Sequence, residues 1–71
     1  MNEFIVVNFA EDTPVYVDGI ECGTSNAKFI VETGTHTFDL GPRPDYAPRS
    51  QTATIVGATA AQPYQLQFWK V

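Results

Sequence analysis

The stretch that decides the fold is VYVDGIECGT, residues 15–24. Its first four residues place two valines on one face and a tyrosine and an aspartate on the other, which is the period-two pattern of a half-buried strand. Asp18-Gly19 then marks a tight turn, because a type I′ turn needs positive φ at both central residues. The stretch therefore predicts a β-hairpin with a short return strand over residues 20–22, after which Gly23 is expected to permit a second bend.

The same alternation extends to both sides of this hairpin. Residues 3–9, EFIVVNF, are β-branched and aromatic, and they predict a strand that could be buried on both faces. The segments 27–33 and 35–40 alternate on either side of a bend at Thr33-Gly34. Two alternating segments across a glycine turn predict a second hairpin.

The last third of the chain adds two further strands. Residues 41–49 hold three prolines and a glycine, which predicts a loop or an open edge, and alternation resumes over 50–57 and 64–71. No window carries the spacing of an amphipathic helix. We therefore expect one all-β domain over residues 1–71, a small sandwich of about seven short antiparallel strands.

Composition narrows the classes of function. The chain has 71 residues, 44% of them hydrophobic and 13% aromatic, which is enough for one small core. The formal net charge is −4, and the four cations are scattered at Lys28, Arg43, Arg49 and Lys70. Nucleic acids and anionic membrane surfaces require a basic stripe, so neither is expected as a partner.

Targeting signals are equally sparse. The N-terminal residues show no basic segment followed by an apolar run, and no apolar stretch approaches the roughly 20 residues of a membrane helix. We expect no membrane insertion. The expected location is the cytoplasm if the chain is full length, and the envelope or the extracellular space if it is an excised domain.

Several turn and core motifs, spread over residues 11–68, resemble those of PEGA domains. The first is Val15-Tyr16-Val17-Asp18-Gly19, followed after three residues by Gly23-Thr24. The middle of the chain has an alternating strand through Phe29 and Val31, then Gly34 with His36 two residues on, and a strand through Phe38 and Leu40. The last is Asp45-Tyr46-Ala47-Pro48, where the family usually carries a glycine-tyrosine pair and a nearby proline. The chain departs from the family in lacking the proline-glutamate-glycine-alanine string. Ser25 also stands where a proline usually follows the threonine, and Asp45 replaces the usual glycine.

PEGA domains are small bacterial and archaeal β-sandwich modules. They are commonly appended to surface, envelope or signalling proteins as presumed non-catalytic interaction modules. The resemblance therefore implies a β-sandwich that works through contacts with proteins.

The residues available for nucleophilic catalysis do not form a credible set. Ser25, Ser50, His36 and Asp39 are the candidates, and a base must meet its orienting carboxylate on one side of the structure. His36 and Asp39 are three residues apart on one predicted strand, so their side chains point to opposite faces. We expect no enzymatic activity and no cofactor.

Metal ligands and reactive thiols are also weakly indicated. One His and one Cys cannot form a zinc site, and Cys22 is expected to be a half-buried residue beside a turn. Glu11, Asp12, Asp18 and Glu21 gather around the first turns, and carboxylates suit calcium. Their spacing follows no calcium-loop pattern, so we expect no metal.

The remaining candidates are binding surfaces. Trp69 is predicted to share a face with two glutamines, Tyr16 lies opposite the two inward valines, and Tyr46 is a third possible stacking ring. The sequence alone leaves open whether Trp69 is exposed or covers the end of the sandwich. Regular threonines at 33, 35 and 37, with 52 and 54 nearby, could order water as ice-binding surfaces do, although threonine is also a good strand former.

We expect a non-catalytic protein-interaction or assembly module that acts through open sheet edges and through Tyr16, Tyr46 and Trp69. A protein partner or self-association is expected, including a homodimer formed by edge strands or by a face. The alternative is a module that binds carbohydrate or another ligand, with the same rings as stacking platforms.

Overall fold

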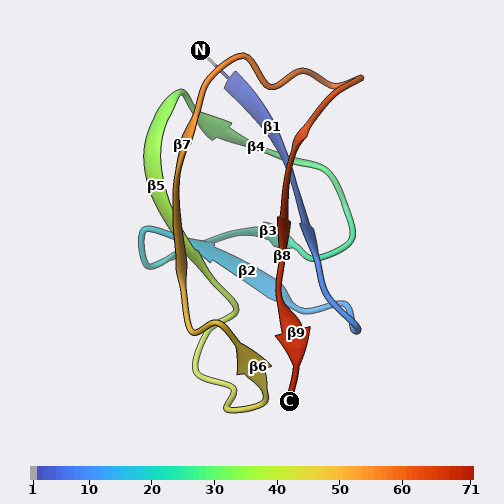
Figure 1. Cartoon of the computed structure of the whole chain (residues 1–71). Helices are drawn as coiled ribbons and strands as arrows, with labels where there is room; N and C mark the ends of the chain where they lie inside the picture. The colour runs from blue at the N-terminus through green and yellow to red at the C-terminus, as the bar shows by residue number, and fades with distance from the viewer. Residues whose placement is uncertain (1) are drawn as a thin grey trace.

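The computed structural model describes residues 2–71 and consists of β-strands joined by turns and loops (Figure 1). The strands are β1 (Asn2–Asn8), β2 (Pro14–Val17), β3 (Ile20–Thr24), β4 (Phe29–Glu32), β5 (Gly34–Asp39), β6 (Tyr46–Ala47), β7 (Gln51–Ile55), β8 (Tyr64–Gln67) and β9 (Trp69–Lys70). The predicted all-β class is confirmed, with nine short strands in place of about seven. Within residues 2–71 there is no helix of the length and apolarity needed to cross a membrane.

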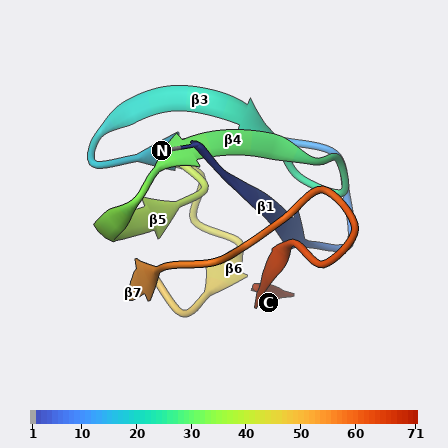
Figure 2. The ribbon, with the colours of Figure 1, turned by 90° about the horizontal axis from the view of Figure 1, so that it is seen from above.

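The strands form two main sheets and a short ribbon. One sheet has the order β4-β1-β8, the second has the order β3-β2-β5-β7, and β6 pairs with β9. Figure 2 shows the edge strands β3 and β4 side by side, with β7 at the opposite side of the fold. The core fills the space between the two sheets.

One strand pair corrects the expectation of a wholly antiparallel fold. β8 runs parallel to β1, with Ile5 opposite Tyr64 and Asn8 opposite Gln67. The cause is the path of the loop after β7, which crosses to the other sheet near the start of β1. At that point the Phe4 N–H donates a hydrogen bond to the Ala58 carbonyl at 3.3 Å. β8 must therefore run in the same direction as β1 (Figure 1).

The core is built by one face of most main strands, as the alternation predicts, whereas β3 contributes no buried residue. Its buried apolar residues are Ile5, Val7, Phe9, Val15, Val17, Val31, Phe38, Leu40, Tyr46, Ile55, Leu66 and Phe68. β1 is buried on this face alone. Its other face is half-buried because no second layer covers that side of the sheet, which corrects the expectation of a strand buried on both faces.

The hairpin that decides the fold forms as expected, but its second glycine has a different role. Asp18 and Gly19 have φ values of 53° and 85°, the positive values that the tight turn requires. Gly23 is not a bend: it lies within β3, next to a register shift in the β2–β3 pairing. A Cβ at this position would lie 2.5 Å from Cγ of Phe29, so the close approach of that ring requires glycine.

The second predicted hairpin is wrong. β4 pairs with β1, whereas β5 pairs with β2 and β7, so the chain crosses from one sheet to the other at Thr33-Gly34. The Glu3 carboxylate secures this crossing. It accepts the Thr33 hydroxyl at 2.5 Å and the Ala58 N–H at 2.7 Å, and the Thr33 contact is the main cause of a lowered pKa at Glu3. Alternation identifies strands but does not choose their partners.

A buried serine joins the first turn to the segment between β3 and β4. The Ser25 hydroxyl donates to the Glu11 carbonyl at 2.7 Å and accepts the Thr13 N–H at 2.9 Å. The Ser25 N–H donates to the Thr13 carbonyl at 2.8 Å, a bond that proline could not make. Proline at position 25 would therefore remove a hydrogen bond between the two segments.

We predict that Ser25→Ala lowers the free energy of unfolding by about 1–3 kcal/mol, because it leaves a buried N–H without its acceptor. Urea denaturation followed by tryptophan fluorescence measures the change. The matched control is Ser50→Ala, at an exposed position, which should shift stability by no more than about 0.5 kcal/mol. Equal midpoints for Ser25→Ala and the wild-type chain would contradict the prediction.

Candidate protein-binding surfaces

The Trp69 side chain is exposed to solvent. β9 continues β8 beyond the buried Phe68 and pairs with β6, where Trp69 lies opposite Ala47. The alternation of the segment therefore turns the indole outward, and 60% of Trp69 is exposed. Of the three aromatic residues singled out from the sequence, Trp69 is the one that fits a stacking surface.

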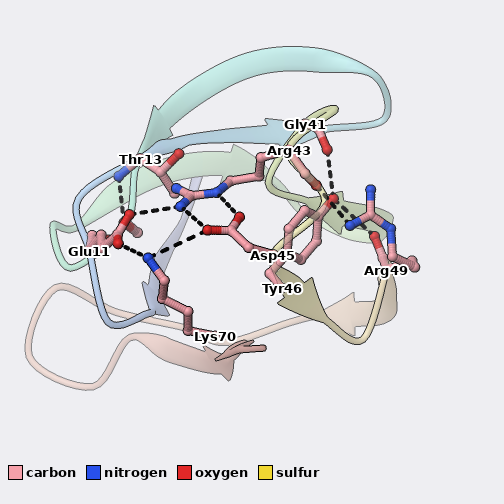
Figure 3. Close-up of polar contacts among 9 residues, drawn as sticks. Glu11, Thr13, Gly41, Arg43, Asp45, Tyr46, Arg49 and Lys70 are labelled. Atoms are coloured by element: carbon pink, nitrogen blue, oxygen red, sulfur yellow. Dashed lines mark hydrogen bonds and ion pairs between the residues drawn. The ribbon is translucent and has the colours of Figure 1, made fainter.

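Tyr46 does not fit that surface. It is 2% exposed, its hydroxyl lies 2.8 Å from the Gly41 carbonyl oxygen, and the Phe68 ring packs against its edge with 5.7 Å between centroids. The Arg49 guanidinium covers its face at 4.1 Å from the ring centre (Figure 3). The prolines of this segment predicted a loop, so no inward direction for the Tyr46 side chain followed from the sequence. In the structure the two-residue strand β6 points Tyr46 into the core.

Tyr16 is half-buried and packs against the loop that follows β5. A Cβ at Gly41 would lie 2.7 Å from Cε1 of Tyr16, so the backbone of this loop rests on the ring. The ring lines a shallow hollow of about 550 Å³. The aromatic ring contacts within residues 2–71 are His36–Phe38 and Tyr46–Phe68, so Tyr16 and Trp69 do not stack on each other.

The hollow beside Tyr16 is bordered by a network of ion pairs that fixes the loop (Figure 3). Arg43 binds both carboxylate oxygens of Asp45, at 2.6 and 2.8 Å, and a Glu11 oxygen at 2.7 Å. Lys70 contacts both Glu11 and Asp45. The Arg43 guanidinium holds the pKa of Asp45 well below its usual range, and the hydrogen bond from Lys70 is the main cause of a lowered pKa at Glu11. These charges bind one another, which favours a structural role.

The acidic residues near the first turns do not converge. Asp18 binds His36, and an Asp12 oxygen accepts the Asn26 amide at 3.0 Å, while Glu11 belongs to the arginine network. No group of three His, Cys, Asp or Glu side chains able to hold a metal is present in the described part of the chain.

His36 links the turn of the first hairpin to β4. Its Nδ1 lies 2.7 Å from Oδ2 of Asp18, and its Nε2 lies 2.7 Å from the Glu32 carbonyl oxygen. Only the imidazolium carries N–H groups on both ring nitrogens, so both contacts are hydrogen bonds only in the charged form. The Asp18 carboxylate is the main cause of a raised pKa at His36, and His36 in turn lowers the pKa of Asp18. Asp39 instead accepts the Gly41 N–H at 2.8 Å.

An apolar groove runs beside His36, along the adjacent edges β3 and β4. Its lining residues are Asn2, Val17, Asp18, Ile20, Cys22, Ile30, Val31, Glu32 and His36. We call this hollow of about 400 Å³ the β3–β4 groove. Ile20 is 68% exposed and Ile30 is 47% exposed. Cys22 is also exposed, which corrects the expectation of a half-buried thiol.

The sequence contained a signal for this groove that was not used. Ile30 lies between Lys28 and Glu32 on the polar face of its strand, so its apolar side chain was out of place there. Ile20 follows the hairpin turn directly. What the sequence could not show is that β3 and β4, which belong to different sheets, lie beside each other.

Comparison with known proteins identifies no relative: no family model, no curated protein and no solved structure matches this chain.

We predict that His36, the only histidine, titrates above its ordinary pKa of 6.5, as read from the pH dependence of its ring proton signals in NMR spectra. Asp18→Asn should lower this pKa towards 6.5, because the carboxylate is removed. Asparagine tolerates positive φ and keeps an acceptor for the Thr37 N–H, so the turn is preserved.

The same pair makes stability depend on pH. Because the pKa of His36 is raised in the folded protein, its contribution to the free energy of unfolding is complete below pH 6.5. That contribution is lost as the pH rises through the folded-state pKa. Because the pKa of Asp18 is lowered in the folded protein, its contribution to the free energy of unfolding is complete above pH 3.8 and is lost on acidification. The stability advantage of the wild-type chain over Asp18→Asn should therefore be largest between these values. An advantage that grows above pH 8 would refute this assignment.

Proposed function

We propose that this protein is a non-catalytic protein-binding module that holds an extended segment of a partner protein in the β3–β4 groove. The observation that carries the proposal is the exposure of Ile20 and Ile30 on two neighbouring edge strands. Branched apolar side chains gathered in a groove are typical of sites that bury an anchor residue of a partner.

The open edges give the partner a second way to bind. β3 is paired on one side with β2, and β4 is paired on one side with β1. An extended segment can add to such an edge through main-chain hydrogen bonds, while a groove beside the edge selects its side chains. The edge would thus provide affinity and the groove would provide specificity.

The charge of the groove indicates the chemistry of the partner. Asp18, Glu32 and His36 lie in its lining, where His36 pairs with Asp18, and the lining drawn from residues 2–71 includes no Lys or Arg. A segment with a branched apolar residue next to Lys or Arg complements this surface. The resemblance to PEGA domains supports the same class of function, since those modules are presumed to act through protein contacts.

A displayed library of random linear peptides tests the proposal. We expect the selected peptides to share a branched apolar residue beside a basic one and to bind more weakly as salt is added. Ile30→Ser or Ile20→Ser should raise the Kd of these peptides at least about tenfold, because burial of an isoleucine is worth about 1.5–3 kcal/mol.

The matched control is Val56→Ser. Val56 is also a branched side chain and is 72% exposed, but it does not line the β3–β4 groove. Peptides that bind Ile30→Ser as tightly as the wild-type chain, or that shift the NMR signals of residues outside the groove alone, would contradict the proposal.

Carbohydrate binding is a second candidate, favoured by one observation, the exposed indole of Trp69. An indole plane can stack on the apolar face of a sugar. We expect any oligosaccharide that binds to change the fluorescence of this single tryptophan, and Trp69→Ala to abolish its binding. A glycan array without hits, or sugar binding that survives Trp69→Ala, would remove this candidate. Tyr46, being buried, has no part in it.

A further inference from the structure

The last third of the chain contains a long segment without charge. Residues 50–69 include no Asp, Glu, Lys, Arg or His, and they supply all of β7 and β8. Each of these strands lies at the edge of a main sheet, and the two edges lie on the side opposite β3 and β4. This side of the molecule therefore differs in charge from the rest of an acidic protein.

The edge of β7 is open to pairing. Its five residues pair with β5, and no other backbone hydrogen bond to Gln51–Ile55 is present within residues 2–71. Edge strands are usually protected from pairing by charged side chains, proline or a bulge. β7 has no charge or proline, and its pairing with β5 runs in unbroken register.

The outer face of this edge carries a ladder of hydroxyl groups. Thr54 lies opposite Thr35 with 2.8 Å between the two Oγ1 atoms, and Thr52 lies opposite Thr37 at 3.0 Å. Thr52 and Thr54 are exposed. Cross-strand threonine pairs of this kind stabilise neighbouring strands.

We propose that β7 pairs antiparallel with β7 of a second copy of the chain, about a two-fold axis at Ala53. In an antiparallel pair, the side chains of directly opposite residues lie on the same face of the sheet. A symmetric pairing of two identical strands must therefore place one residue opposite its own copy. Centring on Ala53 pairs the whole of β7 and places Thr52 opposite Thr54 of the second copy. The hydroxyl ladder then continues across the interface, and the two four-stranded sheets become one.

Self-complementarity favours a second copy as the occupant of this edge, because Thr52 and Thr54 pair with each other about Ala53. Two copies that each carry a net charge of −4 repel each other, and the uncharged edge lets them meet without opposing carboxylates. The interface lies away from the β3–β4 groove, so this inference goes beyond the proposed function and leaves the groove open to a different partner.

Sedimentation of the purified chain, at concentrations up to about 1 mM, tests the inference. We expect a reversible monomer–dimer equilibrium. Thr54→Lys should raise the dimer Kd at least about tenfold, because a lysine at the edge opposes pairing. Thr35→Lys is the matched control: it adds the same charge on the same face and breaks the same Thr35–Thr54 contact, but it lies on the interior strand β5.

A charge exchange tests the register itself. The variants with lysine at both positions, T52K/T54K, and with glutamate at both, T52E/T54E, should each be monomeric. Mixed together they should form a heterodimer, because each lysine then faces a glutamate of the other chain.

Three results would overturn the inference: a wild-type chain that stays monomeric throughout, equal dimer Kd values for Thr54→Lys and Thr35→Lys, or no heterodimer in the mixture. Dimers lost in Ile30→Ser but kept in Thr54→Lys would also overturn it, by placing the contact at the groove. None of these results decides whether the groove binds peptides, which the peptide selection measures separately.

Discussion

Parallel pairing of β1 with β8 is the constraint on which the rest of the structure depends. It joins residues 5–8 to residues 64–67, and the Phe68 N–H continues it by donating to the Asn8 carbonyl at 3.0 Å. Leu66 and Phe68 thereby enter the core. Because β9 follows directly, the same pairing carries the last residues to β6, where Lys70 reaches the ion pairs that fix the loop after β5.

The sequence predicted the features that depend on near neighbours. Side chains of a strand point alternately to its two faces, so the inward direction of Val15, Phe38 or Leu66 follows from the spacing of a few residues. Asp18-Gly19 is likewise a local signal, since the two residues supply the φ values of their own turn. These features were enough to give the fold class.

Features that join distant segments were beyond the reach of such signals. Nothing near Thr33-Gly34 shows that β4 turns to β1 while β5 turns to β2, and nothing near Tyr46 shows that its ring meets Phe68. The groove has the same character, since its walls come from two sheets. The sequence named Trp69 as a candidate but left its exposure open, and it did not indicate that Ile20 and Ile30 would be exposed.

The pairing of β1 with β8 also sets an order of events during synthesis on the ribosome. β1 is made before β4 and can pair with it early, but its second edge stays without a partner until residues 64–68 have been made. Through that interval the apolar side chains of Ile5 and Val7 face an incomplete core. Contacts between distant segments form late and slowly. Until they form, exposed apolar edges can associate with other chains. The nascent chain is therefore most vulnerable to aggregation just before its last strands appear.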